Sequence, residues 1–180
     1  NLILNSSPSM LEIKKPKWFK EKEKQLIKSG KLDLNGEIIE NLAFIGQRPS
    51  LKILDLSYTT ITSLEGLPFQ PKLEYLILDY SSIINFKNAS SISQISKISL
   101  KNTPVSKIPH YKLSLLLICG KNLRIIDGKI IPEKLKNKAK QFSPNAAKLV
   151  DCGWMIESPL PDESDIKDFC LAYGIEYVET

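Results

Sequence analysis

Aliphatic residues recur along the chain at a fixed interval. Four alternating aliphatic–polar–aliphatic stretches begin at Leu32, Leu54, Leu76 and Ile98, which are equally spaced without a slip. Other apolar positions keep this register: Leu51, Leu73 and Ile95 three residues before; Ile39, Ile61, Ile83 and Val105 seven residues after; Leu42, Leu64, Phe86 and Ile108 ten residues after. The pattern L-x-x-L-x-L-x-x-polar-x-I-x-x-L predicts stacked units that share one core.

Each unit is predicted to be a short strand followed by a return segment. Alternation along the strand turns Leu54 and Leu56 toward the core and Ile53 and Asp55 to the opposite face. A fifth copy, shortened relative to the first four, is expected at Leu113, Leu116, Ile118, Leu123 and Ile126. This copy would place Leu115, Leu117 and Cys119 in the outward columns of the last strand.

Residues 32 to 126 resemble leucine-rich repeats of the 22-residue class found in protein phosphatase-1 regulators, axonemal dynein light chains and the A-prime subunit of the branch-site spliceosomal particle. Residues 122 to 133, NLRIIDGKIIPE, resemble the C-terminal cap of that class. The resemblance implies an α/β leucine-rich repeat solenoid with a curved parallel β-sheet on its concave face, short helical or 3-10 returns, and helical caps at both ends. Where such repeats place Asn, this chain has Glu37, Thr59, Ser81, Thr103 and Lys121, which predicts looser turns.

The segments around the repeats divide the chain into three predicted parts. Residues 1–30 form an N-terminal capping helix region, because Trp18, Phe19, Leu26 and Ile27 can share one side of a helix; a lysine-rich helix that binds RNA or membrane is the alternative. Residues 31–142 hold the repeats and the C-terminal cap, whose helix is expected over 132–142. Residues 143–180 form an acidic extension, with a short helix ending near Val150 and a helix over 162–174, that either packs on the cap or docks a partner.

Composition and charge narrow the class of protein. With 42% apolar and 25% charged residues, the 180-residue chain is typical of one globular unit and is not disordered. No run of eighteen apolar residues predicts a membrane span, and three widely spaced cysteines favour a reducing compartment. We therefore expect an intracellular protein of the cytoplasm or nucleus, with a cytoskeletal or axonemal location also open.

The net charge of +5 is distributed unevenly along the chain. Residues 14–31 and 121–148 each carry a balance of +6, whereas residues 151–180 carry −7. Basic segments raise nucleic acid as a partner, but an acidic tail in the same chain can also neutralise them.

Little in the sequence supports catalysis. His110 is the single histidine, and the phosphate-loop, dinucleotide-binding and zinc-hydrolase motifs are all missing. Asp33 and Asp55 are expected to be neighbours on an open strand face. Water there would keep the pKa of a carboxylate near its ordinary value. We expect no enzymatic activity, no cofactor and no metal site.

The outward strand positions are the best candidates for a binding site. They carry exposed apolar and aromatic residues ringed by charge: Asp33, Ile53, Asp55, Tyr58, Tyr75, Ile77, Asp79, Tyr80, Lys97 and Lys101. The first hypothesis is an interaction adaptor that binds a helix or peptide of another protein there. The second is a ribonucleoprotein component in which a basic cap contacts RNA phosphate through Arg124, Lys129, Lys134, Lys136, Lys138 and Lys140. No oligomeric state is predicted.

Overall fold

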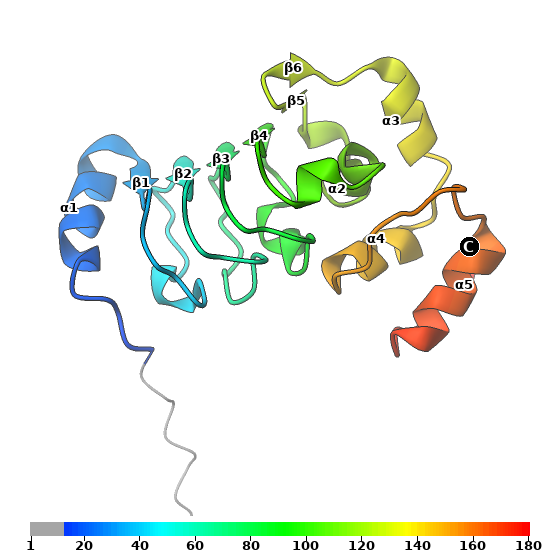
Figure 1. Ribbon diagram of the computed structural model, residues 1–180, viewed down its shortest axis with the longest axis horizontal. Helices are drawn as coiled ribbons and strands as arrows, with labels where there is room; N and C mark the ends of the chain where they lie inside the picture. The colour runs from blue at the N-terminus through cyan, green and yellow to red at the C-terminus, as the bar shows by residue number, and fades with distance from the viewer. Residues whose placement is uncertain (1–12) are drawn as a thin grey trace, which may run out of the picture.

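A six-stranded sheet forms the spine of the molecule, in a computed structural model that describes residues 13–180. Five strands run parallel in chain order, and a sixth pairs antiparallel with the fifth: β1 (Lys31–Asp33), β2 (Ile53–Asp55), β3 (Tyr75–Ile77), β4 (Lys97–Ser99), β5 (Ile125–Ile126) and β6 (Lys129–Ile130). The first four strands stand side by side in a row from the left to the centre of Figure 1.

The register of these strands follows the constant spacing of the sequence. Leu32 lies opposite Leu54, Leu54 opposite Leu76, and Leu76 opposite Ile98. All four side chains are fully buried on one face of the sheet. A repeat of constant length with period-two alternation permits a single register between neighbouring strands. A slip by one residue would move every aliphatic side chain of a strand from the core face to the solvent face.

The turns after the strands repeat as well. Residues 36, 58, 80 and 102 all adopt left-handed backbone, as Gly36, Tyr58, Tyr80 and Asn102. The amides of the first three donate to the carbonyls of Ser57, Asp79 and Lys101 in the next repeat, at 2.9 to 3.0 Å. The Thr59 and Thr103 hydroxyls donate to carbonyls three residues back at 2.7 Å. At these two positions the prediction of looser turns is wrong, because a threonine hydroxyl closes the turn. At the equivalent Ser81 the buried hydroxyl has no hydrogen-bond partner among the described residues.

The return segments are short 3-10 helices or irregular chain that fill the other side of the core. They are η1 (Ala43–Ile45), η2 (Ala89–Ile92) and η3 (Val105–Lys107). Leu42, Leu64 and Phe86, ten residues after each strand's first aliphatic, are fully buried among them. Apolar side chains thus join strand and return in one core.

Helix α1 (Phe19–Ser29) covers the β1 end of the sheet. Phe19 and Leu26 are buried, and Phe19 meets Phe44 edge-on at 4.9 Å. Gly30 ends the helix in left-handed backbone. Ile27 was expected on the buried side but is 78% exposed, because one residue along a helix turns the side chain by about 100° away from the Leu26 side. The expected N-terminal region 1–30 includes residues 1–12, which lie outside the described part.

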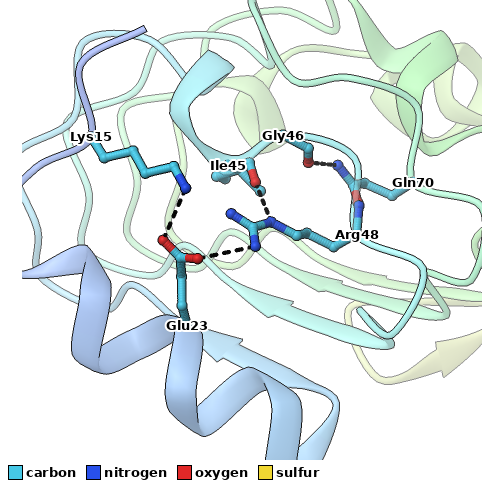
Figure 2. A network of polar contacts seen from close by, with 6 residues as sticks. All are labelled: Lys15, Glu23, Ile45, Gly46, Arg48 and Gln70. Carbon is cyan, nitrogen blue, oxygen red and sulfur yellow. Dashed lines mark hydrogen bonds and ion pairs between the residues drawn. The ribbon is translucent and has the colours of Figure 1, made fainter.

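A polar network ties α1 to the first return segment (Figure 2). The guanidinium of Arg48 donates to Glu23 of α1 at 3.1 Å and to the carbonyl of Ile45 at 2.6 Å. The buried amide of Gln70 accepts from the Arg48 backbone and donates to the Gly46 carbonyl. The network pairs the polar groups at this end of the core, as burial requires.

The expected fifth repeat copy is wrong. Residues Tyr111–Cys119 form helix α2, followed by η4 (Gly120–Asn122), and the next parallel strand is β5. Ile126 pairs with Ile98, so this unit is longer than those before it, whereas the copy was expected to be shorter. The run from Leu115 to Cys119 is apolar throughout, and an uninterrupted apolar run fits a helix buried on several sides as well as a strand.

Three further helices follow β6: α3 (Glu133–Ala139), α4 (Pro144–Asp151) and α5 (Glu163–Ala172). Helices α3 and α4 pack on α2, and α5 packs on α4, at the end of the molecule opposite α1 (Figure 1). A capping box between Asp162 and Asp165 starts α5, and its Ile166 and Cys170 are buried. Within residues 13–180, no helix has both the length and the apolar character that a membrane crossing requires.

Candidate interaction face

The face of the sheet turned away from the core carries the candidate site. We define the open face as the outward residues of β1 to β4, which are Lys31, Asp33, Ile53, Asp55, Tyr75, Ile77, Lys97 and Ser99. All except the buried Ser99 are half-buried. The apolar and aromatic members lie on the two central strands, with charged residues to either side. The fold therefore brings Asp33, Ile53, Asp55, Tyr75, Ile77 and Lys97 together on one surface.

Two tyrosines continue this surface past the ends of the strands. The rings of Tyr58 and Tyr80 stack with centroids 4.7 Å apart and planes 4° from parallel. They remain 58% and 50% exposed. Both residues hold left-handed backbone, with φ of 57° and 58°. The repeated turn sets the two rings one strand spacing apart, which makes a flat aromatic surface open to solvent.

Tyr75 lies at the centre of the open face and has a cation above its ring. The Lys97 ammonium sits 4.4 Å from the ring centroid, a cation–π contact between β3 and β4. Partial burial raises the pKa of Tyr75, and the carboxylates of Asp79, Asp55 and Asp127 raise it further. The phenol therefore stays protonated and offers a hydrogen-bond donor at neutral pH.

The two aspartates of the open face, and Asp79 just past the end of β3, already hold the turns. Asp33 and Asp55 each accept the backbone amide two residues ahead, at 3.0 and 2.9 Å. Asp79 accepts from the Ser99 hydroxyl at 2.6 Å and from the Lys101 amide at 2.9 Å. These bonds use one carboxylate oxygen each, so the other oxygen of each group has no protein donor among the described residues. The face can thus accept hydrogen bonds from a basic partner without losing its turns.

Asp127 adds to the acidic character of this region and was not among the predicted site residues. It follows β5 with φ of 53°, accepts the Leu100 amide at 2.6 Å and accepts the Tyr111 hydroxyl at 2.6 Å. Burial, together with the bond to Asp127, raises the pKa of Tyr111. The Asp127-Gly128 pair directly after an aliphatic strand was a signal for such a turn.

The basic residues assigned to RNA phosphate lie on several elements at the C-terminal end of the sheet. Lys136 and Lys140, one helical turn apart, line a groove against α2 and α4. Lys138 lies on another side of α3, near Asp162 and Glu163. Arg124 precedes β5, Lys129 belongs to β6, and Lys134 is exposed at the start of α3. Helical periodicity separates charges that the sequence shows as one run.

The expected outward position of the Cys119 thiol is also wrong. Cys119 ends α2 and is buried, and burial raises its pKa to about 12. A buried thiol with a raised pKa is not a nucleophile at neutral pH. Leu115 is buried in the same helix and Leu117 is half-buried, so neither belongs to the open face.

His110 has a partner that the sequence does not predict. Its Nε2 lies 2.8 Å from the hydroxyl of Ser158, a residue 48 positions away. No acidic group is hydrogen-bonded to the other ring nitrogen within residues 13–180, so the pair lacks the group that orients a catalytic histidine. The described residues also contain no cluster of three His, Cys, Asp or Glu side chains suited to a metal ion.

The sequence matches no protein-family model and no curated protein. Among solved structures it is similar to a chain in the crystal structure of the Drosophila melanogaster SNF/U2A' complex, with 24% identity and a TM-score of 0.42, covering 62% of this chain and 80% of that chain. It is also similar to a chain of the Chaetomium Mex67:Mtr2 subunits, with 18% identity and a TM-score of 0.35, covering 50% of this chain and 67% of that one.

Similarity at this level does not extend to what either protein binds. The in-register strands and repeated turns of the chain itself make its fold leucine-rich-repeat-like.

Proposed function

We propose that the protein is a non-enzymatic interaction module that binds a helix or an extended peptide of another protein on its open face. In this proposal the repeats are a curved solenoid, the open face is its concave side, and α1 and the β6–α3 region are its caps. Residues 31–142 form this unit, and residues 143–180 are an extension packed on its C-terminal end. The tyrosines at 58 and 80 and the lysine at 101 belong to the same site.

The stacked pair of Tyr58 and Tyr80 is the observation that carries the proposal. Both rings are exposed, and neither contributes to the core. Left-handed backbone costs a bulky residue about 1 kcal/mol relative to Gly. Aromatic rings held in this conformation at solvent-exposed positions are hard to explain by stability, whereas tyrosines are favoured anchors in protein interfaces.

Charge across the face favours a partner of mixed charge. Asp33, Asp55 and Asp79 lie at β1, β2 and β3, and Lys97 and Lys101 lie at β4, with Lys31 on β1 and Asp127 after β5 adding the opposite charge at each end. A bound segment would therefore present basic groups to the aspartates and acidic groups to Lys97 and Lys101.

The experiment is affinity purification from a cell lysate with quantitative mass spectrometry. Replacing Tyr75 and Ile77 together by Asp is expected to remove the proteins that co-purify with the wild type. Ile38→Asp is the matched control, since Ile38 is an isoleucine outside the open face that is 82% exposed. If the double variant is folded by circular dichroism and still retains every partner, the open face is not the site.

Tyr58→Gly provides a second variant with little effect on folding. Gly relieves the left-handed strain of about 1 kcal/mol, which offsets the loss of a ring stack worth about 0.5–1.5 kcal/mol. We expect unchanged stability in urea but weaker partner capture. A change in stability without a change in capture would contradict the role given to Tyr58.

The ribonucleoprotein alternative has less support. Its six basic residues lie before β5, on β6 and along α3, where Lys138 lines a different pocket from Lys136 and Lys140. A phosphate backbone binds best along a continuous row of cations. Undetectable binding of single-stranded RNA at low salt would remove this alternative, and a steep loss of binding with added salt would support it.

A further inference from the structure

A groove among the C-terminal helices forms a second surface, lined by none of the residues of the open face. It lies between α2, α3 and α4 and has a volume of about 560 Å³. Its apolar lining consists of Leu116, Leu117, Ala139, Phe142, Pro144 and Ala147. None of these residues belongs to the sheet, so a molecule in the groove would not compete with one on the open face.

The groove exists because α2 has more apolar surface than its neighbours cover. Leu117 and Ile118 of α2 are half-buried, although every residue from Leu115 to Cys119 is apolar. Helix α3 is seven residues long and has no fully buried residue. Where α3 and α4 approach α2, they present the small side chains of Ala139 and Ala147. Short and small neighbours leave a strip of α2 open.

The rim of this groove is basic. Lys121, Lys136 and Lys140 line it together with one acidic residue, Glu133. Glu133 pairs with Lys136 at 3.2 Å, which leaves Lys121 and Lys140 without an ion pair among residues 13–180. An apolar floor between two free ammonium groups is complementary to a segment with apolar side chains along one face and carboxylates beside them.

We propose that this groove docks an acidic amphipathic helix of a protein partner. Its leucine or phenylalanine side chains pack on Leu117, Phe142 and Pro144, and its carboxylates pair with Lys121 and Lys140. Nucleic acid fits the site less well, because phosphates would meet the lysines but leave the apolar floor in contact with water. The groove therefore selects for apolar content as well as for negative charge.

Helix α5 of the chain itself also combines carboxylates with exposed apolar side chains. A second copy of the protein is therefore an alternative occupant of the groove. Helix α5 carries Glu163, Asp165 and Asp168, and it exposes Phe169 and Leu171. A second copy of the chain could present α5 to the groove, so the test must separate a foreign partner from self-association.

The probe is a fluorescein-labelled synthetic peptide with Glu on one helical face and Leu and Phe on the other, measured by fluorescence anisotropy. We expect saturable binding to the wild-type protein. Replacing Lys121 and Lys140 together by Glu should weaken it at least about tenfold, since two attractions become repulsions. Lys129→Glu with Lys134→Glu changes the charge equally outside the groove and should weaken it less than about threefold.

Two further controls separate the groove from general charge attraction. Ala147→Trp fills the groove without changing charge and should abolish binding, with folding checked by circular dichroism. A peptide with Ser in place of Leu and Phe should not bind. Equal binding of that peptide, equal effects of the two Lys-to-Glu double variants, or no binding of the acidic amphipathic peptide would each overturn the proposal.

Two outcomes would assign the groove to another occupant. If a single-stranded RNA oligonucleotide binds with the same dependence on Lys121 and Lys140, the site recognises phosphate. If the wild type dimerises in sedimentation and Lys121→Glu with Lys140→Glu makes it monomeric, the occupant is a second copy. Both results overturn the proposed partner, and neither depends on Tyr75, Ile77 or Tyr58, whose variants test the open face separately.

Discussion

Single residues in left-handed backbone show a conflict between the residue types that stabilise a turn and those suited to the proposed binding. At the four equivalent turn positions, Gly36 and Asn102 are the residue types that tolerate this conformation, whereas Tyr58 and Tyr80 are not. The two tyrosines also stack in the open. Strained residues persist where the surrounding structure holds them and where they serve a function, which is why the two rings, together with the open face beside them, are the proposed site.

Asp151 is a residue whose importance appears only in the structure. From the end of α4 its backbone carbonyl accepts the Asn88 amide at 2.9 Å, and its carboxylate accepts the Ser90 amide at 2.8 Å. We expect Asp151→Ala to lower the free energy of unfolding by about 1 kcal/mol, because an amide in the first turn of η2 loses its acceptor. Urea denaturation measures this, with exposed Asp168→Ala as the control; equal midpoints for the two variants would contradict it.

At the scale of elements, polar contacts decide how each end is attached to the core. Arg48 joins α1 to η1 through two acceptors and also lies over the Phe19 ring at 5.6 Å. At the other end, the Asn145 amide both donates to and accepts from the backbone of Val178. These attachments involve residues 25 and 33 positions apart.

Arg48→Lys is expected to destabilise the attachment of α1. A lysine has one ammonium and cannot bond Ile45 and Glu23 in the fork geometry of a guanidinium. The expected loss is about 1–2 kcal/mol in urea denaturation. Lys87→Ala, which removes an exposed ion pair with Glu65, should change stability by less than about 0.5 kcal/mol. A loss for Arg48→Lys no larger than for this control would show that the network contributes little.

The C-terminal segment after α5 should be released by acid. Burial acts to raise the pKa of Glu163, but hydrogen bonds from Ser143, Tyr177 and Asn145 outweigh it and hold the pKa below its ordinary value of 4.5. A lowered folded pKa gives stability that is present above pH 4.5 and lost as the pH falls through the folded pKa. Hydrogen-exchange protection of the Val178 amide should therefore fall below pH 4.5. In Glu163→Gln this protection should not change with pH below 4.5. If the protection still falls there in the variant, Glu163 is not the source of the acid sensitivity.

The same segment should loosen again in strong base. The hydrogen bond to Glu163 raises the pKa of Tyr177 to about 12 from its ordinary 10. A raised folded pKa gives stability that is complete below pH 10 and lost as the pH rises through 12. Absorbance of the tyrosinate in wild type and Tyr177→Phe would locate this titration, and a titration of Tyr177 near pH 10 would contradict the bond.

At the scale of the whole molecule, one buried apolar cluster runs from Phe19 in α1 to Cys170 in α5. It passes through every strand from β1 to β5, the return segments, and the helices α2 and α4. Charges far apart in the sequence also come together at this scale. Lys138 of the basic segment lines one pocket with Asp162 and Glu163 of the acidic segment. No break in the core separates the repeats from the C-terminal helices within the described residues.

A continuous core predicts one cooperative unfolding transition. The two tryptophans report opposite ends, because Trp18 lies beside Phe44 and Trp154 beside Phe169. In Trp18→Phe and in Trp154→Phe, fluorescence reports only the tryptophan that remains. Its urea midpoint should equal the circular dichroism midpoint of the same variant. Fluorescence midpoints that differ from the circular dichroism midpoint of the same variant would show that the ends unfold separately.

The sequence by itself determined the repeated part of the fold. A constant spacing with period-two alternation allows one register between the strands. The repeat spacing therefore predicted which residues of β1 to β4 face the core, and it placed Tyr58 and Tyr80 at equivalent positions of adjacent units. Most residues of the open face were therefore predictable as a surface, although what binds there was not.

Only the tertiary structure decided the C-terminal half. The apolar run from Leu115 to Cys119 fits strand and helix alike, and its neighbours α3 and α4 select the helix. The groove, the His110–Ser158 contact and the role of Asp151 join residues up to 61 positions apart outside any repeat. Such contacts follow from packing between unlike elements, for which the sequence contains no period to count.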